Sequence, residues 1–248
     1  MFRPPLVLAS LSGHADSAWA RAGSGFAGGA ILGGIALDEP ARRAARKLVA
    51  RDREEFLPPD PLAFVEGELA ALEDVPIRPG FNVRAATIEP IPDVARICQD
   101  RDALLEINAH CRQEELCAVG CGETLLRDTD RLRQYVAAAV ETGAEVGVKV
   151  RAEVPGVDLP SLARALECAG ATYIHVDAMD TEAVIAEIVA ESDLYVIANN
   201  GVRDEATVRE YLAYGADAVS VGRPSDNPTV LERVERALES VSSIHTQP

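Results

Sequence analysis

The sequence predicts a (β/α)8 barrel, a TIM barrel of the α/β class, formed as a single domain over residues 1–248. Eight short apolar segments alternate with amphipathic stretches, which is the order expected of a parallel sheet whose outer face is covered by helices. Eight such units fill the roughly 250 residues typical of this barrel, and the last unit ends close to the C-terminus. A doubly wound sheet is the alternative that the same alternation leaves open.

Each expected strand is a short apolar run bounded by polar or turn-forming residues. The near-continuous apolar character of "EVGVKV" and "LYVIA" is typical of parallel strands that are buried on both faces. In chain order, the expected strands cover residues 5–9, 28–37, 80–85, 104–109, 145–151, 172–178, 194–200 and 217–223.

Amphipathic helical patterns lie between these strands. Several of them open on aspartate, a preferred N-cap, and several close on glycine, a preferred C-cap. Residues 52–80 are longer than an ordinary connection and contain several prolines, so we expect an extra helical segment inside that βα unit. The other expected helices cover residues 39–56, 91–100, 128–143, 158–170, 180–192, 204–216 and 226–241.

The charge balance is strongly acidic. Aspartate and glutamate number 40 against 24 basic residues, for a formal net charge of -16, and only Lys47 and Lys149 are lysines. Such a surface predicts a halophilic protein that works in concentrated salt, where self-repulsion is screened; an ordinary acidic protein is the alternative. In dilute salt this charge would repel nucleic acid, whereas near molar salt the screening length falls to about 3 Å. The charge therefore counts against RNA binding without excluding it.

The sequence also predicts where the protein works. No run approaches the roughly 18 apolar residues that a membrane span requires, and "MFRPPLVLASLSG" lacks the pattern of a secretory signal. Five cysteines are an odd number, and their clustering does not resemble a disulfide framework. We therefore expect a soluble, cytoplasmic protein with reduced thiols and no membrane partner.

Polar residues gather where the expected strands end, which is where TIM barrels build their active sites. Lys149 is the most informative, because it lies inside an apolar run and a buried ammonium is costly unless it faces a partner. It either pairs with a neighbouring strand or faces a negatively charged cofactor. The full set at the strand ends is Asn82, Arg84, Asn108, His110, Cys111, Lys149, Arg151, His175, Asp177, Asn199, Asn200, Gly222 and Arg223.

The last two expected strands are followed by glycines that favour an anion site. Gly201 follows the seventh strand, and Gly222 with Arg223 follows the eighth, just before the expected helix that begins near Asp226. TIM barrels bind phosphate with backbone N–H groups of these two loops. Ordinary turn chemistry is the alternative for each glycine alone.

Three cysteines and a histidine lie within twelve residues of one loop, at His110, Cys111, Cys117 and Cys121. A metal site is one interpretation, but the loop lacks the short Cys-x2-Cys pairs typical of zinc and cluster sites, and we predict no metal. Cys111 directly follows a strand, where a thiol can donate a proton to a carbanion. We expect one working thiol, with Cys98 and Cys168 packed on helices.

These motifs resemble those of the FMN-dependent tRNA-dihydrouridine synthases, with dihydroorotate dehydrogenases as more distant relatives. The segment "INAHC" resembles the family's Asn-x-Gly-Cys-Pro motif, and "GCGETLLRD" resembles its Gly-x-Gly-x-x-Leu-Leu-x-Asp motif. "VKVR" resembles its Lys-x-Arg, and "GADAVSVGR" its closing Gly-Arg.

The resemblance implies a flavin-dependent oxidoreductase that reduces the C5=C6 bond of a uracil-type ring, in tRNA or in a free pyrimidine. It implies that Cys111 donates the proton and that Asn108 orients the pyrimidine. The electron donor stays open, with a nicotinamide as one candidate. Asn82 stands where the family usually has Gln. The FMN-binding residues implied on this chain are Asn82, Lys149, His175, Asn199, Gly201, Gly222 and Arg223.

The departures from the family lie on the substrate side. His110 and Arg112 replace the Gly and Pro of the cysteine motif, and the segment after His175 lacks the family's Arg. We expect no C-terminal helical domain, the part of the family that helps to bind tRNA. Two alternatives to a dihydrouridine synthase therefore stay open: a small-molecule pyrimidine or dihydroorotate-type dehydrogenase, and a non-catalytic flavin- or phosphate-binding barrel.

Overall fold

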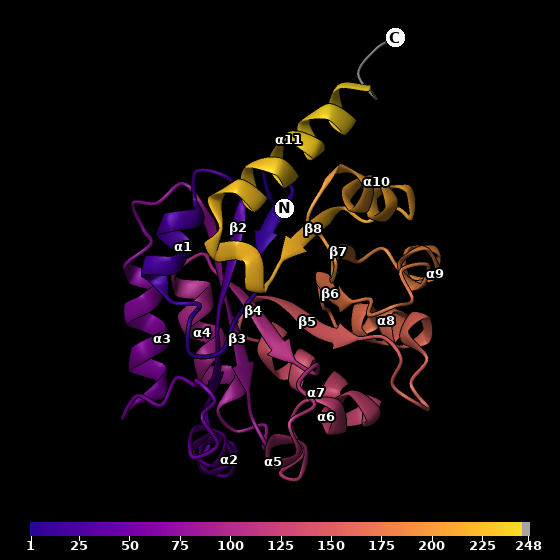
Figure 1. Ribbon diagram of the computed structural model, residues 1–248. Helices are drawn as coiled ribbons and strands as arrows, with labels where there is room; N and C mark the ends of the chain where they lie inside the picture. The colour runs from indigo at the N-terminus through magenta and orange to yellow at the C-terminus, as the bar shows by residue number, and fades with distance from the viewer. Residues whose placement is uncertain (245–248) are drawn as a thin grey trace.

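The computed structural model describes residues 1–244 and contains a closed barrel of eight parallel strands, which confirms the predicted fold (Figure 1). Each strand pairs with its neighbours in chain order, and β8 closes the barrel by pairing with β1. The strands are β1 (Leu6–Leu8), β2 (Gly29–Ala36), β3 (Arg78–Arg84), β4 (Leu104–Asn108), β5 (Glu145–Arg151), β6 (Tyr173–Asp177), β7 (Tyr195–Asn199) and β8 (Ala218–Val221).

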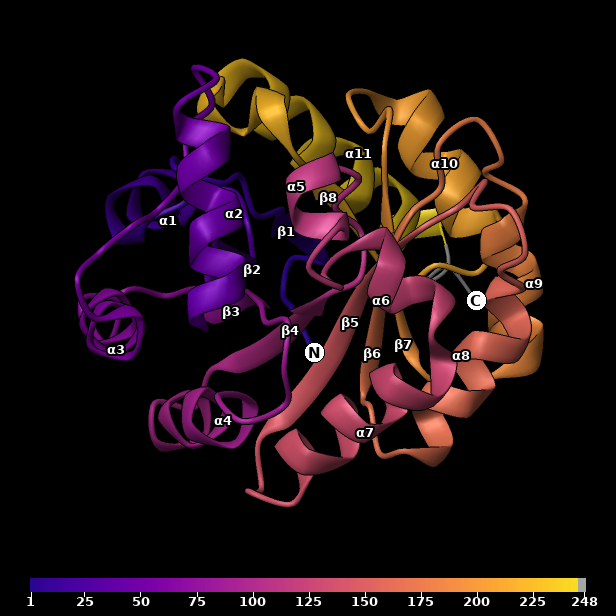
Figure 2. The ribbon, with the colours of Figure 1, turned by 90° about the horizontal axis from the view of Figure 1, so that it is seen from below.

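Helices surround the strands on the outside (Figures 1 and 2). None of the helices in residues 1–244 has both the length and the apolar character needed to cross a membrane. The helices are α1 (Ser17–Gly23), α2 (Glu39–Val49), α3 (Pro61–Ala70), α4 (Ile91–Asp100), α5 (Glu114–Cys117), α6 (Glu123–Arg127), α7 (Thr129–Val140), α8 (Leu159–Cys168), α9 (Val184–Glu191), α10 (Glu205–Ala213), the 3-10 turn η1 (Arg223–Asp226) and α11 (Pro228–Ile244).

Several helices differ from the sequence prediction in length. The pattern over residues 39–56 forms a helix only as far as Val49, because Asp52 adopts a left-handed backbone with φ of 59° that ends the run. Helix α3 lies within the segment 52–80. Helix α1 was not expected, although Asp16 caps it by accepting the Trp19 N–H.

The interior of the barrel is divided into an apolar end and a polar end. Side chains alternate between the inside and the outside of each strand, so β4 turns Leu104, Glu106 and Asn108 inward and packs Leu105 and Ile107 against the helices. The apolar end is filled by one buried cluster of Phe2, Val7, Ile31, Leu104, Tyr173, Ile197 and Ala218. One step nearer the carboxyl ends of the strands, the inward positions are polar.

Tyr173 is the largest side chain in this apolar cluster, and it fits because β5 carries a glycine beside it. A Cβ atom added at Gly147 would lie 2.3–2.4 Å from atoms of the Tyr173 ring. The phenol oxygen of Tyr173 donates a hydrogen bond to the Leu105 carbonyl at 3.2 Å. The ring therefore seals the floor of the barrel below the polar layer.

Gly147→Ala should lower the free energy of unfolding by about 1–3 kcal/mol, because the added methyl group would overlap the Tyr173 ring in a closely packed interior. Gly67→Ala is a matched control. Gly67 lies in α3 with nothing within 4 Å of an added Cβ, so this variant should gain roughly 0.5–1 kcal/mol. Chemical denaturation measures the free energy of unfolding of both variants. Equal changes in the two would show that the Tyr173 ring does not limit the space at Gly147.

Candidate active site

Polar and charged side chains from six strands meet at the carboxyl end of the barrel, below its mouth. Polar and charged groups are rarely buried in a folding core, so this concentration is a candidate functional site. The buried members are Asn82 and Arg84 of β3, Glu106 and Asn108 of β4, Lys149 and Arg151 of β5, His175 of β6 and Ser220 of β8.

Glu106 lies at the centre of this group and is fully buried. One carboxylate oxygen accepts a hydrogen bond from Asn82 Nδ2 at 2.6 Å, and the other lies 2.7 Å from His175 Nδ1. Burial alone would raise the pKa of Glu106, but His175, the Lys149 ammonium and the Asn82 amide outweigh it and lower the pKa. Glu106 is therefore a buried anion.

His175 connects Glu106 with the last two strands. Burial, the largest effect, lowers the pKa of His175, so the ring is neutral. A carboxylate can only accept, so the ring proton lies on Nδ1 and Nε2 accepts from the Ser220 hydroxyl at 2.7 Å. Ser220 Oγ in turn accepts from Asn199 Nδ2 at 2.7 Å.

A second branch runs from Glu106 to the cysteine loop. Asn82 Oδ1 accepts from Asn108 Nδ2 at 2.8 Å. Asn108 Oδ1 accepts the backbone N–H groups of His110 at 3.2 Å and Cys111 at 3.0 Å. Every donor in both branches thus points toward Glu106, and the position of Cys111 depends on that carboxylate through two amides.

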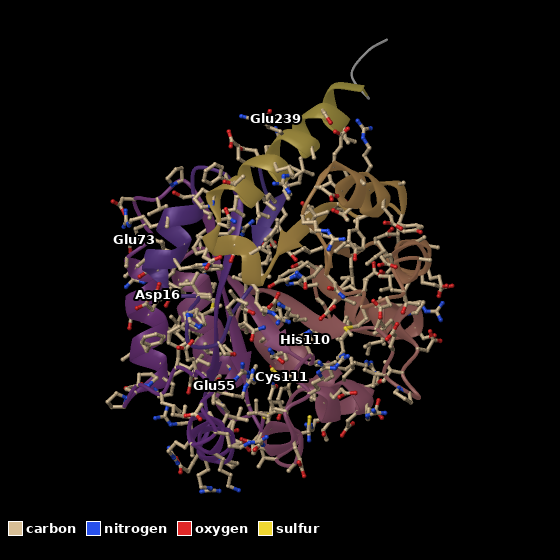
Figure 3. All side chains as sticks on the ribbon, in the orientation of Figure 1. Asp16, Glu55, Glu73, His110, Cys111 and Glu239 are labelled. Atoms are coloured by element: carbon tan, nitrogen blue, oxygen red, sulfur yellow. The ribbon has the colours of Figure 1, made fainter. Side chains whose placement is uncertain are left out.

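The Cys111 thiol lies among ionisable groups at the barrel mouth. Figure 3 shows it next to His110, with Glu55 on the same side of the molecule. Burial alone would raise the pKa of Cys111, but the Arg84 guanidinium and His110 outweigh it and lower the pKa to about 7. At neutral pH, therefore, the thiol is more readily ionised than an ordinary cysteine.

Arg84 is held in place for this role. It forms a buried ion pair with Glu55, with Nη1 2.5 Å from the carboxylate, and it also contacts Ser12 Oγ. Burial lowers the pKa of Arg84, but the nearby Cys111 and Glu55 raise it more, so the guanidinium stays charged. Glycine at position 34 leaves space here, because a Cβ would lie 3.2 Å from Arg84 Nε.

Lys149 has no hydrogen-bond or ion-pair partner among residues 1–244, although its side chain is buried at 5% exposure. It stands beside Asn108 and His175 in the strand register. The alternative of a salt bridge to a neighbouring strand is therefore not what the structure shows. An ammonium without such a partner, on a residue this little exposed, fits an anionic group bound at the mouth, such as the reduced ring of a flavin.

The loops after β7 and β8 offer backbone donors. In the described part of the chain, the N–H groups of Gly201, Val202, Gly222 and Arg223 donate to no protein acceptor. The first turn of α10 is different, because its own Asp204 and Thr207 form a capping box. Helix α11 begins at Pro228, close to the start expected near Asp226, but the 3-10 turn η1 lies between it and β8. A phosphate at this mouth would therefore bind the loop amides rather than a helix N-terminus.

The remaining cysteines do not form a metal site or a disulfide. Within residues 1–244, no group of three or more His, Cys, Asp and Glu side chains is arranged to hold a metal ion, and all five cysteines are free. Burial raises the pKa of Cys98 and, together with Asp38, that of Cys121, each to about 12. Cys117 contacts the Cys111 carbonyl at 3.5 Å.

The structure therefore brings the sequence-predicted residues together at one end of the barrel. His175 and Asn82 are fully buried, Asn108 is 4% exposed, and all three are hydrogen-bonded inside the protein, so they position their neighbours. Direct contacts of these three with flavin or substrate stay predictions. Sequence reasoning placed Asp177 at a strand end but missed Glu106 as a member of the network. A glutamate inside the apolar run "LLEINA" was the available signal.

Comparison with known proteins gives a family match. The family model described as dihydrouridine synthase matches residues 84–246 of this chain. A relative, an uncharacterized protein of Methanocaldococcus jannaschii, is 25% identical over 231 residues, which cover 88% of this chain and 88% of the relative.

Solved structures share the barrel fold. A mutant form of FabK from Thermotoga maritima superposes with a TM-score of 0.60 at 17% identity; the match covers 89% of this chain but only 62% of the FabK chain. A chain of the tryptophan synthase complex of Pyrococcus furiosus gives a TM-score of 0.60 at 13% identity, covering 98% of this chain and 100% of that one. At these identities the likeness concerns the fold alone.

Glu106→Gln should lower the free energy of unfolding by about 3–5 kcal/mol at neutral pH, because the new amide N–H faces groups that already donate. The pKa of Glu106 is lowered by folding, so its contribution is present above the unfolded pKa and is lost as the pH falls through the folded value. The deficit should therefore shrink below pH about 4.3. Urea denaturation across pH measures it.

Glu145→Gln is the matched control for that substitution. Glu145 pairs with Arg78 at 2.7 Å on the partly exposed opposite end of the barrel, so its removal should cost only about 0.5 kcal/mol. A Glu106→Gln deficit as small as this one, or one independent of pH, would contradict the central role of Glu106.

Proposed function

The chain belongs to the dihydrouridine synthase family, a family of flavin-dependent oxidoreductases, and on this basis we propose that it uses FMN to reduce the C5=C6 bond of a uracil-type ring. The single observation that carries the proposal is Lys149, a residue only 5% exposed whose ammonium has no hydrogen-bond or ion-pair partner in the described residues, at the same barrel mouth as the readily ionised Cys111. An anion-binding amine and a proton-donating thiol are the two groups that such a reduction requires from the protein.

In this proposal, different residues of the protein bind the cofactor and transfer the proton. A bound flavin supplies hydride to one carbon of the double bond. Cys111 gives its proton to the neighbouring carbon, which becomes basic as the bond is reduced. Lys149 would hold the negatively charged flavin ring, and the free amides after β7 and β8 would bind the FMN phosphate.

Arg151 supports a polar substrate at the same mouth. It is the last residue of β5 and is 8% exposed, and its Nε atom is buried without a hydrogen-bond partner. Its recorded side-chain contact is a weak one, from Nη2 to the Met179 sulfur at 3.5 Å. A guanidinium left in this state suits a carbonyl oxygen or an anionic group of the substrate.

The proposal includes tRNA as the leading substrate and a free pyrimidine as the alternative. The net charge of -16 opposes RNA binding in dilute buffer, so RNA binding by this protein would depend on high salt. We further propose a cytoplasmic location, which the five free cysteines support.

Lys149→Ala should weaken FMN binding by roughly tenfold or more and make the bound flavin harder to reduce, because a charged partner of the ring is lost. The visible absorption spectrum and the reduction potential of the purified protein measure both effects. Lys47→Ala removes the only other lysine, which is exposed on α2, and should change neither. Unaltered occupancy and potential in Lys149→Ala would remove this residue from the flavin site.

Cys111→Ala should keep the flavin but lower the reduction rate by roughly 10²–10⁴-fold, because the proton donor is missing. Cys117→Ala, in the same loop, should retain activity. The assay supplies unmodified tRNA, free uridine and dihydroorotate in separate arms, in molar KCl and in dilute buffer, with a nicotinamide donor.

A deletion strain tests the substrate in the cell. The dihydrouridine content of its tRNA should fall, and it should be restored by the wild-type gene and by Cys117→Ala but not by Cys111→Ala. An unchanged dihydrouridine content would exclude tRNA and leave a free pyrimidine. Protein that binds flavin but turns over in none of the arms would instead indicate a non-catalytic barrel.

A further inference from the structure

His110 lies between Cys111 and Asp177 at the barrel mouth. Its Nε2 atom is 2.7 Å from Asp177 Oδ2, which leaves Nδ1 as the ring nitrogen available to the Cys111 thiol. Asp177 is the last residue of β6, and its other oxygen accepts the Met179 N–H at 3.3 Å. The thiol, the imidazole and the carboxylate are thus arranged in the order in which proton relays are built.

Hydrogen bonds fix the backbone of His110 and Cys111. Neighbouring side chains in a strand point to opposite faces, but β4 ends at Asn108, and both N–H groups are held by the Asn108 side chain. Glu123 N–H also donates to the Cys111 carbonyl at 2.8 Å. The imidazole therefore has a fixed position relative to the thiol.

The Cys111 thiol is less exposed to solvent than the side chains of His110 and Asp177. Cys111 is 7% exposed, whereas the side chain of His110 is 29% exposed and that of Asp177 is 16% exposed. A thiol that has given its proton to a substrate above it cannot readily regain one from bulk water. His110 is the neighbour through which a proton from water can reach it.

Charged groups from the surrounding strands and loops also face this pair. Arg84 of β3 favours the thiolate, whereas Glu55, on the chain before α3, opposes it. For His110, burial lowers the pKa, Asp177 and Cys111 raise it, and Lys149 of β5 lowers it, with a net rise. Cys121, whose pKa is raised to about 12, stays a neutral thiol.

The pKa of Asp177 shifts in the opposite direction to that of His110. Burial raises the pKa of Asp177, but His110 outweighs it and lowers the pKa. The carboxylate is therefore ionised while the imidazole holds its extra proton, and the two stabilise each other.

We propose that His110, anchored by Asp177, is the proton relay of Cys111. This rests on the proposed function and adds to it the route of the proton. The Cys111 S–H bond breaks as a C–H bond forms on the substrate. The imidazolium Nδ1–H bond then breaks as the S–H bond reforms. The neutral imidazole regains a proton from a hydronium ion of the solvent, which becomes water, while its Nε2–H keeps its hydrogen bond to Asp177 Oδ2. The relay transfers protons only, so no residue of the protein is oxidised or reduced.

His110 is a feature of this chain rather than of the family's cysteine motif, in which glycine occupies that position. The glycine has no group that could accept or return a proton. His110 is therefore a positioning and relay residue, whose effect should be visible in the ionisation of the thiol itself.

The test measures the pH dependence of iodoacetamide alkylation at each cysteine, by peptide mass spectrometry of the full-length protein without substrate. In the wild type, the midpoint for Cys111 should lie near pH 7. His110→Asn should raise this midpoint by about one unit or more, and Asp177→Asn should raise it by a smaller amount. Cys168, exposed at the end of α8, is alkylated in the same sample, and its midpoint should be identical in all three proteins.

A Cys111 midpoint that stays at the wild-type value in either variant would overturn the proposal. A general loss of structure would expose the buried thiol of Cys98 to alkylation together with Cys111, so it is distinguished from a specific effect. The measurement needs neither tRNA nor turnover, so failure of the proposed substrate would leave it interpretable.

Discussion

The buried carboxylate of Glu106 is the constraint on which the rest of the site depends. It is an anion inside the barrel, and it is tolerated because Asn82 and His175 bond to it directly and Lys149 lies nearby. Since a carboxylate can only accept, it fixes the direction of every hydrogen bond that leads to it. The ring proton of His175, the hydroxyl of Ser220 and the amide of Asn108 all take their orientation from this single acceptor.

The direction of these hydrogen bonds also fixes the cysteine loop at the mouth of the barrel. The Asn108 side chain donates a hydrogen bond to Asn82 Oδ1, and its oxygen accepts the backbone N–H groups of His110 and Cys111. The loop that carries the thiol is thereby tied to the strand β4. A chain of neutral amides transmits the position of one buried charge to the reactive sulfur, without adding a further charge to the interior.

Two opposing requirements meet at Cys111. Burial of the thiol keeps water away from the reacting atoms but disfavours the thiolate, whereas Arg84 and His110 favour it. Lys149, close by, makes no hydrogen bond within residues 1–244, and Arg151 keeps an unsatisfied nitrogen. Cations without an anionic partner lower the stability of the folded protein. They become favourable when an anionic cofactor and a polar substrate bind at the barrel mouth, beside the thiol with the lowered pKa.

The sequence by itself determined the barrel, because eight apolar runs with capped helices between them allow few other arrangements. It also placed Cys111, Lys149 and the two glycine loops at the same end, since all parallel strands share a carboxyl edge. Only the tertiary structure decided which partners those residues have. Glu106 bonds to His175 across two strands, and His110 meets Asp177 from a distant loop, because barrel closure and register set contacts that no local pattern contains. The length of α2 was likewise settled by one left-handed residue, Asp52, that helical periodicity does not reveal.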